Sequence, residues 1–253
     1  MEVFYAILFF IIGSVLASFY CVLATRLPEG KSIIKPRSHC IFCKHELSWY
    51  ELIPIFSFVF LKGKCHACGK KIPIHTFLTE IITGFLFSCA YLYYGFSYNF
   101  YVSLILISLG ILIFISDFLY MIILDSPLII AGISLFLLKW HFYNVDTAFS
   151  SLIEGGIMFL FMIVVAILGK ILFKREALGG GDIKLSFLIG MTVGIPYGFM
   201  VLVLSTFLAL PYATFSLLTN TSHEVPYGPF LISALCLVFL YYDKFSYILN
   251  LFM

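Results

Sequence analysis

Long apolar runs recur along this chain, and they restrict its fold more than any other feature. Hydrophobic residue types make up 62% of the 253 residues, and charged types only 11%. Soluble domains average about 45–50% apolar and about 25% charged residues. Apolar runs of bilayer-spanning length predict transmembrane helices. The chain is therefore predicted to be an all-α polytopic integral membrane protein, with the lipid bilayer as its surroundings.

About eight transmembrane helices are expected from these runs. The candidate spans are Val3–Leu23, Phe77–Tyr94, Phe100–Ser116, Pro127–Phe142, Leu152–Phe173, Leu185–Ile195, Tyr197–Leu217 and Phe230–Tyr247. The sixth is short, as in a tilted or broken helix. The first lacks a basic leading region and a small-residue cleavage motif, which indicates a retained helix and not a signal peptide. The predicted parts are a first helix at 1–25, a polar loop domain at 26–75 and a transmembrane core at 76–253.

Lysine and arginine residues concentrate between the first two candidate spans. Nine of the fifteen basic residues lie from Arg26 to Lys71. The positive-inside rule places this loop in the cytoplasm and the N-terminus outside. The alternative is a nucleic-acid-binding patch, but Glu29, Glu46 and Glu51 dilute its charge and membrane spans enclose it. No nucleic-acid partner is expected.

Two aspartates are predicted to lie on the cytoplasmic side when the later spans are threaded from this loop. Asp117 ends the third span, and Asp182 precedes the sixth. A second basic segment, from the end of the fifth span to the start of the sixth, agrees with that sidedness. Its basic residues are Lys170, Lys174, Arg175 and Lys184. Asp117 and Asp182 are thus expected at the same membrane boundary.

Two CxxC pairs in the polar loop have the spacing of metal ligands. Cys40 and Cys43 form the first pair, and Cys65 and Cys68 the second, as in a four-cysteine zinc ribbon. A reducing cytoplasm keeps such thiols available for metal. We expect a structural zinc ion here, whose closed shell of four thiolates leaves no position for a catalytic water. The alternative is redox-active or disulfide-bonded cysteines, which would require an oxidising compartment.

A carboxylate that is energetically costly near a membrane follows three glycines, whose backbone no side chain covers. They lie in the run Leu178-Gly179-Gly180-Gly181-Asp182-Ile183-Lys184. Asp117 has no basic residue near it in the sequence, because none occurs between Lys71 and Lys139. Two facing aspartates cannot both ionise easily, so one can act as a base and the other as an acid in hydrolysis. The glycines Gly179, Gly180 and Gly181, together with Lys184, are predicted to receive the substrate backbone.

Asp182, Lys184 and Asp125 each have a structural role as the alternative to a functional one. Asp182 also suits a helix N-cap after a glycine-rich turn, and Lys184 is near enough for an ion pair with it. Asp125, in Leu124-Asp125-Ser126-Pro127, is predicted to be the N-cap of the fourth span, with Pro127 near the first turn.

An ordered set of motifs resembles the type IV prepilin peptidase family in its bacterial form. The opening segment, from Phe10 to Pro28, resembles the family's first-helix signature, and the two CxxC pairs match its cytoplasmic domain. Asp117 stands at the position of the family's first catalytic aspartate. Gly179-Gly180-Gly181-Asp182 fits the GxGD motif that carries the second, and Val225-Pro226-Tyr227-Gly228-Pro229-Phe230 resembles a late motif. One departure is Ile123-Leu124-Asp125, where the family usually has Ile-Pro-Asp or Ile-Pro-Asn.

The resemblance implies an aspartic endopeptidase of the bacterial inner membrane. Its implied partners are prepilin or pseudopilin precursors, cleaved after a short basic leader at the cytoplasmic face by Asp117 and Asp182. Members of the family often also methylate the new N-terminus with S-adenosylmethionine, although no motif in this sequence marks a pocket for that cofactor.

Two other function classes compete with the peptidase. An ion-coupled transporter or proton channel also uses intramembrane acids, but its sites lie near the bilayer midplane, and no inverted repeat is evident. A zinc-dependent membrane hydrolase needs an open metal position with a motif such as HExxH, which the sequence lacks.

Overall fold

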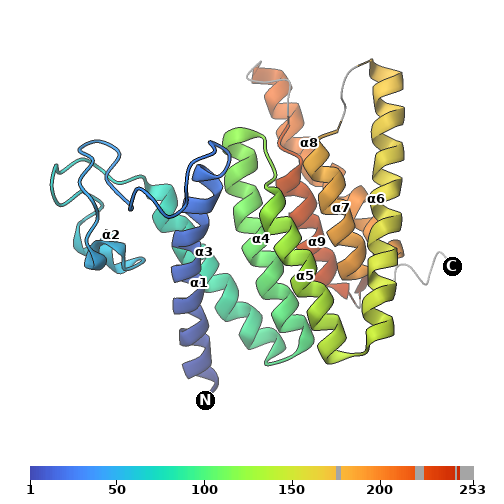
Figure 1. The fold of residues 1–253 in the computed structure, drawn as a ribbon, viewed down its shortest axis with the longest axis horizontal. Helices are drawn as coiled ribbons and strands as arrows, with labels where there is room; N and C mark the ends of the chain where they lie inside the picture. The colour runs from blue at the N-terminus through green and yellow to red at the C-terminus, as the bar shows by residue number, and fades with distance from the viewer. Residues whose placement is uncertain (175–177, 220–224, 243, 246–253) are drawn as a thin grey trace. The chain divides into compact units, whose positions relative to one another are not determined.

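The computed structural model describes residues 1–174, 178–219, 225–242 and 244–245, and within this part the regular elements are helices, joined by turns and by an irregular polar loop between α1 and α3 (Figure 1). The long helices are α1 (Glu2–Arg26), α3 (Ile74–Tyr94), α4 (Tyr98–Tyr120), α5 (Asp125–Phe142), α6 (Val145–Phe173), α7 (Gly180–Val193), α8 (Ile195–Thr219) and α9 (Gly228–Leu240). Two short helices, η1 (Trp49–Leu52) and α2 (Phe56–Phe60), lie in the polar loop. The predicted all-α class is confirmed.

Each predicted span coincides with one of the long helices. Five of them, α1, α3, α4, α6 and α8, are long and apolar enough to cross a membrane, and α9 is a shorter apolar helix. That α5, α7 and α9 also cross the membrane, as the predicted eight spans require, stays a prediction. The last predicted span continued to Tyr247, and Arg175 belonged to the predicted second basic loop. Both residues lie outside the described part.

The chain divides into two compact units, residues 1–115 and 116–253. We call them unit 1 and unit 2, and the boundary falls within α4. The division predicted from the sequence, at residues 25 and 75, stays a prediction.

Unit 1 is built around the pairing of α1 with α3. A Cβ atom on Gly13 of α1 would lie 3.0 Å from the Cα atom of Gly84 of α3, so the two backbones touch. Ser14 Oγ donates to the carbonyl of Glu80 across the same contact, at 3.1 Å. Small residues and hydroxyl groups are the usual means by which membrane helices pack closely.

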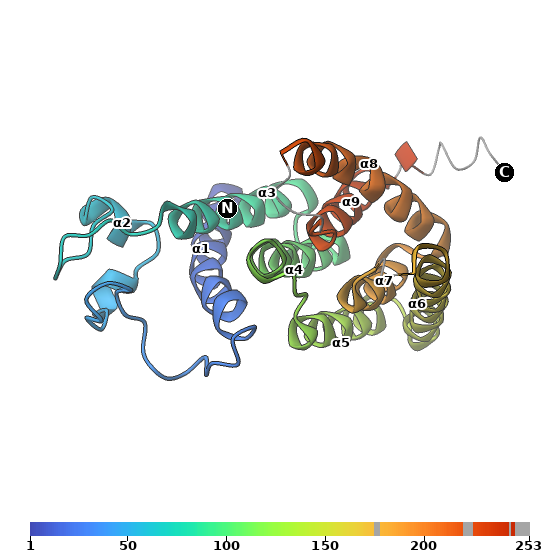
Figure 2. The same cartoon turned by 90° about the horizontal axis from the view of Figure 1, so that it is seen from above.

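Unit 2 surrounds α7, which contacts α5, α6, α8 and α9. In both views α7 lies beside α6 (Figures 1 and 2). A Cβ atom on Gly190 of α7 would lie 2.8 Å from the Cα atom of Gly155 in α6, which requires glycine at this crossing. Nearly every residue from Leu185 to Val193 is buried. A helix enclosed by neighbours is apolar on all sides, which explains the short sixth apolar run in the sequence.

Candidate active site and metal centre

Asp182 lies in the first turn of α7 and points into unit 2. Gly179 holds the N-cap position in an extended conformation, so the interpretation of Asp182 as the N-cap is wrong. The Asp182 carboxylate instead reaches back to accept a hydrogen bond from the Gly179 backbone, as an acid at this position does in a capping box. Asp182 is 8% exposed, and its Oδ1 has no hydrogen-bond partner among the described residues.

Asp117 lies in the last turn of α4 and is also buried, at 6% exposure. The backbone N–H of Gly228, the first residue of α9, donates to Asp117 Oδ2 at 3.1 Å. Helix N-termini stabilise negative charge, and α9 therefore supplies the polar partner that no local basic residue provides. None of the ion pairs found in the described ranges involves Asp117 or Asp182.

The fold places these two aspartates within range of electrostatic interaction although they are 65 positions apart in the sequence. Their carboxyl groups interact electrostatically, and the Tyr227 hydroxyl group interacts with Asp182 in the same way. Tyr227 is held by Ser205 of α8, with 2.6 Å between the two hydroxyl oxygens. The sequence singled out Tyr227 and Gly228 only as part of a late motif, and gave them no role at the site.

The glycine run has two structural uses. A Cβ atom on Gly181 would lie 2.6 Å from Cβ of Ile123, in the turn after α4, so Gly181 allows that turn to pack against α7. A Cβ atom on Gly179 would approach Asp182 Oδ2 at 3.1 Å, whereas one on Gly180 would meet nothing within 4 Å. The predicted contact of these glycines with substrate stays a prediction.

Lys184 forms an ion pair with Asp125, with 2.6 Å between Nζ and Oδ1. The prediction that Asp125 is the N-cap of the fourth span is wrong, because Leu124 holds that position and no side chain caps the helix. Asp125 lies one residue later, and its side chain extends toward α7 instead. Both side chains are more than half exposed, so the pair contributes only about 0–1 kcal/mol to stability. Binding of substrate by Lys184 stays a prediction.

The four predicted zinc ligands form one cluster in unit 1. The sulfur atoms of Cys40, Cys43, Cys65 and Cys68 all lie within 4.8 Å of one another. Cys40 is 3.8 Å from Cys68, and Cys43 is 3.9 Å from Cys65. A Zn–S bond of about 2.3 Å implies about 3.8 Å between the sulfurs of a regular tetrahedron. The residues therefore fit a tetrahedral zinc ion.

The two CxxC pairs fold into matching turns. Cys40 N–H donates to the His45 carbonyl, and Cys65 N–H to the Lys70 carbonyl, at 2.9 and 2.8 Å. The residue after each second cysteine has a positive φ angle, 60° at Lys44 and 68° at Gly69. The backbone amides of Cys43 and Phe42 lower the pKa of Cys40 to about 6. Such turns aim two sulfurs at a common point, and a cation there relieves the repulsion between their thiolates.

Comparison with known proteins gives the family. The model "Bacterial Peptidase A24 N-terminal domain" matches residues 11–94, and the model "Type IV leader peptidase family" matches residues 104–214.

The relatives carry the name prepilin leader peptidase/N-methyltransferase. The one from Bacillus subtilis is 33% identical over 238 residues, covering 93% of this chain and 94% of the relative. That from Myxococcus xanthus is 34% identical, over 74% of this chain and 55% of the relative. The relative from Vibrio cholerae is 29% identical, over 94% of this chain and 98% of the relative. No solved structure matches. The chain belongs to the type IV leader peptidase family.

Proposed function

We propose that this chain is an aspartic prepilin leader peptidase whose catalytic pair is Asp117 and Asp182. The observation that carries the proposal is the electrostatic interaction of these two buried carboxyl groups in unit 2, with Asp182 Oδ1 unpartnered in the described structure. The family supports a peptidase, since the matching model is that of the leader peptidases. Nothing in the comparisons supports a transporter or proton channel.

Hydrolysis by the pair follows from its shared charge. Two neighbouring buried carboxyl groups hold one proton between them, so one is a base and the other an acid. The base takes a proton from water as the water oxygen attacks the peptide carbonyl carbon, and the acid gives its proton to the carbonyl oxygen. When the C–N bond breaks, the leaving nitrogen receives a proton and both carboxyl groups return to their starting state.

The proposal includes a class of substrate and the side of the membrane at which cleavage occurs. The relatives' printed names point to prepilins, and the predicted topology points to cleavage at the cytoplasmic face of a bacterial inner membrane. In the same proposal the four-cysteine cluster binds structural zinc, and the protein also methylates the new N-terminal amine, as the relatives' second printed activity suggests.

Co-expression with a prepilin tests the proposal directly. Mass spectrometry of the pilin is expected to show loss of the leader, and a further mass increase of one methyl group. The inactive variant Asp182→Asn serves as the reference for unprocessed protein. An unprocessed pilin in the presence of folded, membrane-inserted wild-type protein would contradict the peptidase assignment.

A further inference from the structure

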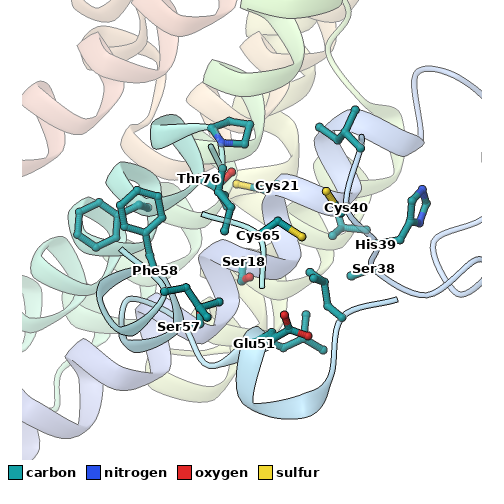
Figure 3. Close-up of a pocket in the computed structure, with 18 of the residues that line it drawn as sticks. Ser18, Cys21, Ser38, His39, Cys40, Glu51, Ser57, Phe58, Cys65 and Thr76 are labelled. Atoms are coloured by element: carbon teal, nitrogen blue, oxygen red, sulfur yellow. The ribbon is translucent and has the colours of Figure 1, made fainter. Parts of the chain in front are cut away.

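Two buried carboxylate oxygens have no hydrogen-bond partner within the described residues. One is Glu51 Oε1, on the wall of the unit 1 cavity between α1, α3 and the polar loop (Figure 3). The other is Asp182 Oδ1 in unit 2, where a second buried carboxyl group, that of Asp117, interacts with it. Leaving a buried acceptor unpaired is costly, so Asp182 Oδ1 is suited to a hydrogen-bond donor that takes part in the reaction.

Tyr227 interacts with both aspartates of the proposed site. It precedes Gly228, whose backbone N–H donates to Asp117 Oδ2 at 3.1 Å, and its own hydroxyl group interacts electrostatically with Asp182. Tyr227 is also the N-cap residue of α9, and its carbonyl accepts two N–H groups from the first turn of that helix, at 3.1 Å each. The start of α9 therefore fixes the backbone from which the Tyr227 side chain extends.

The hydrogen bond between Tyr227 and Ser205 of α8 has a definite direction. Ser205 Oγ lies 2.6 Å from the Tyr227 hydroxyl oxygen, and it donates to the Leu202 carbonyl at 2.7 Å. A serine hydroxyl group has a single hydrogen, and the fully buried Ser205 gives that hydrogen to Leu202. Tyr227 is therefore the donor to Ser205, and the lone pairs of the Tyr227 oxygen remain available as acceptors.

The site thus contains two acceptors, Asp182 Oδ1 and the Tyr227 oxygen, to which no described side chain donates. An ionised carboxylate and an acceptor oxygen cannot hydrogen-bond to each other. A water molecule has two hydrogens, and buried waters typically satisfy such polar groups. Hydrolysis by the aspartate pair needs one water molecule, whose oxygen must keep a lone pair free for attack.

We propose that Tyr227 is a catalytic residue of the peptidase that positions the attacking water. The inference rests on the proposed function and adds a third residue to the aspartate pair. The water donates one hydrogen bond to the carboxylate that acts as the base and the other to the Tyr227 oxygen, which directs a lone pair toward the peptide carbonyl carbon. The base removes the first hydrogen as the C–O bond forms. Tyr227 keeps its own proton, bonded to Ser205, and ends the step unchanged.

Steady-state cleavage of a purified prepilin by the full chain tests this role. Tyr227→Phe removes only the hydroxyl group, and it is expected to lower kcat about 10–100-fold. KM should stay close to that of the wild type, because the lost hydrogen bond is made to water and not to the substrate. The matched control is Tyr212→Phe in α8, whose ring packs against Phe230 of α9 with 5.8 Å between centroids. Its kcat is expected to equal that of the wild type.

Ser205→Ala is a second test, in which the ring and hydroxyl group of Tyr227 both remain. Without its acceptor, the Tyr227 proton is free to point toward the water, so kcat is expected to fall, by a smaller factor than in Tyr227→Phe. The variant with both substitutions should be no slower than Tyr227→Phe alone, because Ser205 acts through the tyrosine. A merely structural role would instead give losses that multiply, with a lower unfolding temperature in detergent.

Four results would each overturn the inference: a wild-type kcat in Tyr227→Phe, a raised KM with unchanged kcat, an equal loss in Tyr212→Phe, or losses that multiply in the double variant. If Tyr227→Phe does not fold, Ser205→Ala decides, and a wild-type kcat in that variant overturns the inference. In all these cases the wild type still cleaves prepilin. Absence of cleavage by folded wild-type protein would contradict the peptidase proposal itself, so the two proposals fail separately.

Discussion

At the scale of single residues, the side chains of Asp117 and Asp182 each accept a hydrogen bond from the backbone at the start of a helix. Asp117 accepts the N–H of Gly228 at the start of α9, and Asp182 accepts a hydrogen bond from Gly179 at the start of α7. Both helix termini stabilise negative charge. In the proposed mechanism, these two helix termini stabilise the single negative charge that the two carboxyl groups share.

Gly181 is expected to be less replaceable than its neighbour Gly180. In Gly181→Ala the new Cβ atom meets Ile123 Cβ at 2.6 Å, so the turn after α4 must move. We expect a loss of about 1–3 kcal/mol in stability, together with slower cleavage. Gly180→Ala is the matched control, since its Cβ atom meets nothing within 4 Å. Thermal unfolding is the measurement that compares the two variants, and equal losses of stability would refute the packing role of Gly181.

The residues that sequence patterns can mark are those with distinctive chemistry. The four cysteines could be identified by their spacing. Asp117 and Asp182 could be identified because a carboxylate at the margin of a membrane span is energetically costly. Gly228, Ile123 and the hydroxyl group of Tyr227 could not be found in this way. Their importance comes from contacts between segments far apart in the chain, and nothing local in the sequence encodes those contacts.

At the scale of elements, α7 carries Asp182 and is held in place by close glycine contact with α6. Lys139 of α5 adds a hydrogen bond to the Met191 carbonyl, 2.6 Å long, near the other end of α7. A cation at a helix C-terminus is favourable. The position of Asp182 therefore depends on contacts along the whole helix, as well as on the glycine turn before it.

Gly190→Ala is expected to destabilise unit 2 and to slow cleavage. The added Cβ atom would lie 2.6 Å from the backbone carbonyl oxygen of Glu154, and backbone cannot move aside as a side chain can. The control is Gly156→Ala in α6, where the space is open. Thermal unfolding in detergent is expected to show a lower midpoint for Gly190→Ala alone. A similar midpoint in both variants would show that α6 and α7 do not require this contact.

The cysteine turns are expected to bind one zinc ion per chain that is not used in cleavage. Cys43→Ser should lose the metal, measured by elemental analysis, whereas Cys89→Ser in α3 should keep it. Brief exposure to a chelator should leave leader cleavage unchanged, because the closed shell offers no site for a reacting water. Rapid, zinc-reversible loss of cleavage in a still-folded protein would indicate a catalytic metal instead.

At the scale of the whole molecule, each predicted span matched one helix because apolar length is a strong signal in membrane proteins. The Asp125 assignment failed, since its ion pair with Lys184 joins segments distant in sequence. The division into units at residue 115 could not be predicted either, because the boundary falls within the apolar α4.

The distribution of basic residues predicts which side of the membrane each helix end faces. Alkaline phosphatase fused after Tyr143, between α5 and α6, should be active because that junction is expected outside. A fusion after Lys174 should be inactive, because α6 is expected to end in the cytoplasm. The reverse pattern would move the predicted cleavage to the outer face.

The central claim is that Asp117 and Asp182 act as one catalytic unit, and single-turnover cleavage of a purified prepilin tests it most directly. Asp117→Asn and Asp182→Asn are each expected to lower the rate by about 10²–10⁴-fold, and the double variant no further, because either loss disables the pair. The exposed Asp146→Asn in α6 should cleave as wild type. A single variant with a near-normal rate, or a double variant slowed by the product of the two single losses, would contradict the account.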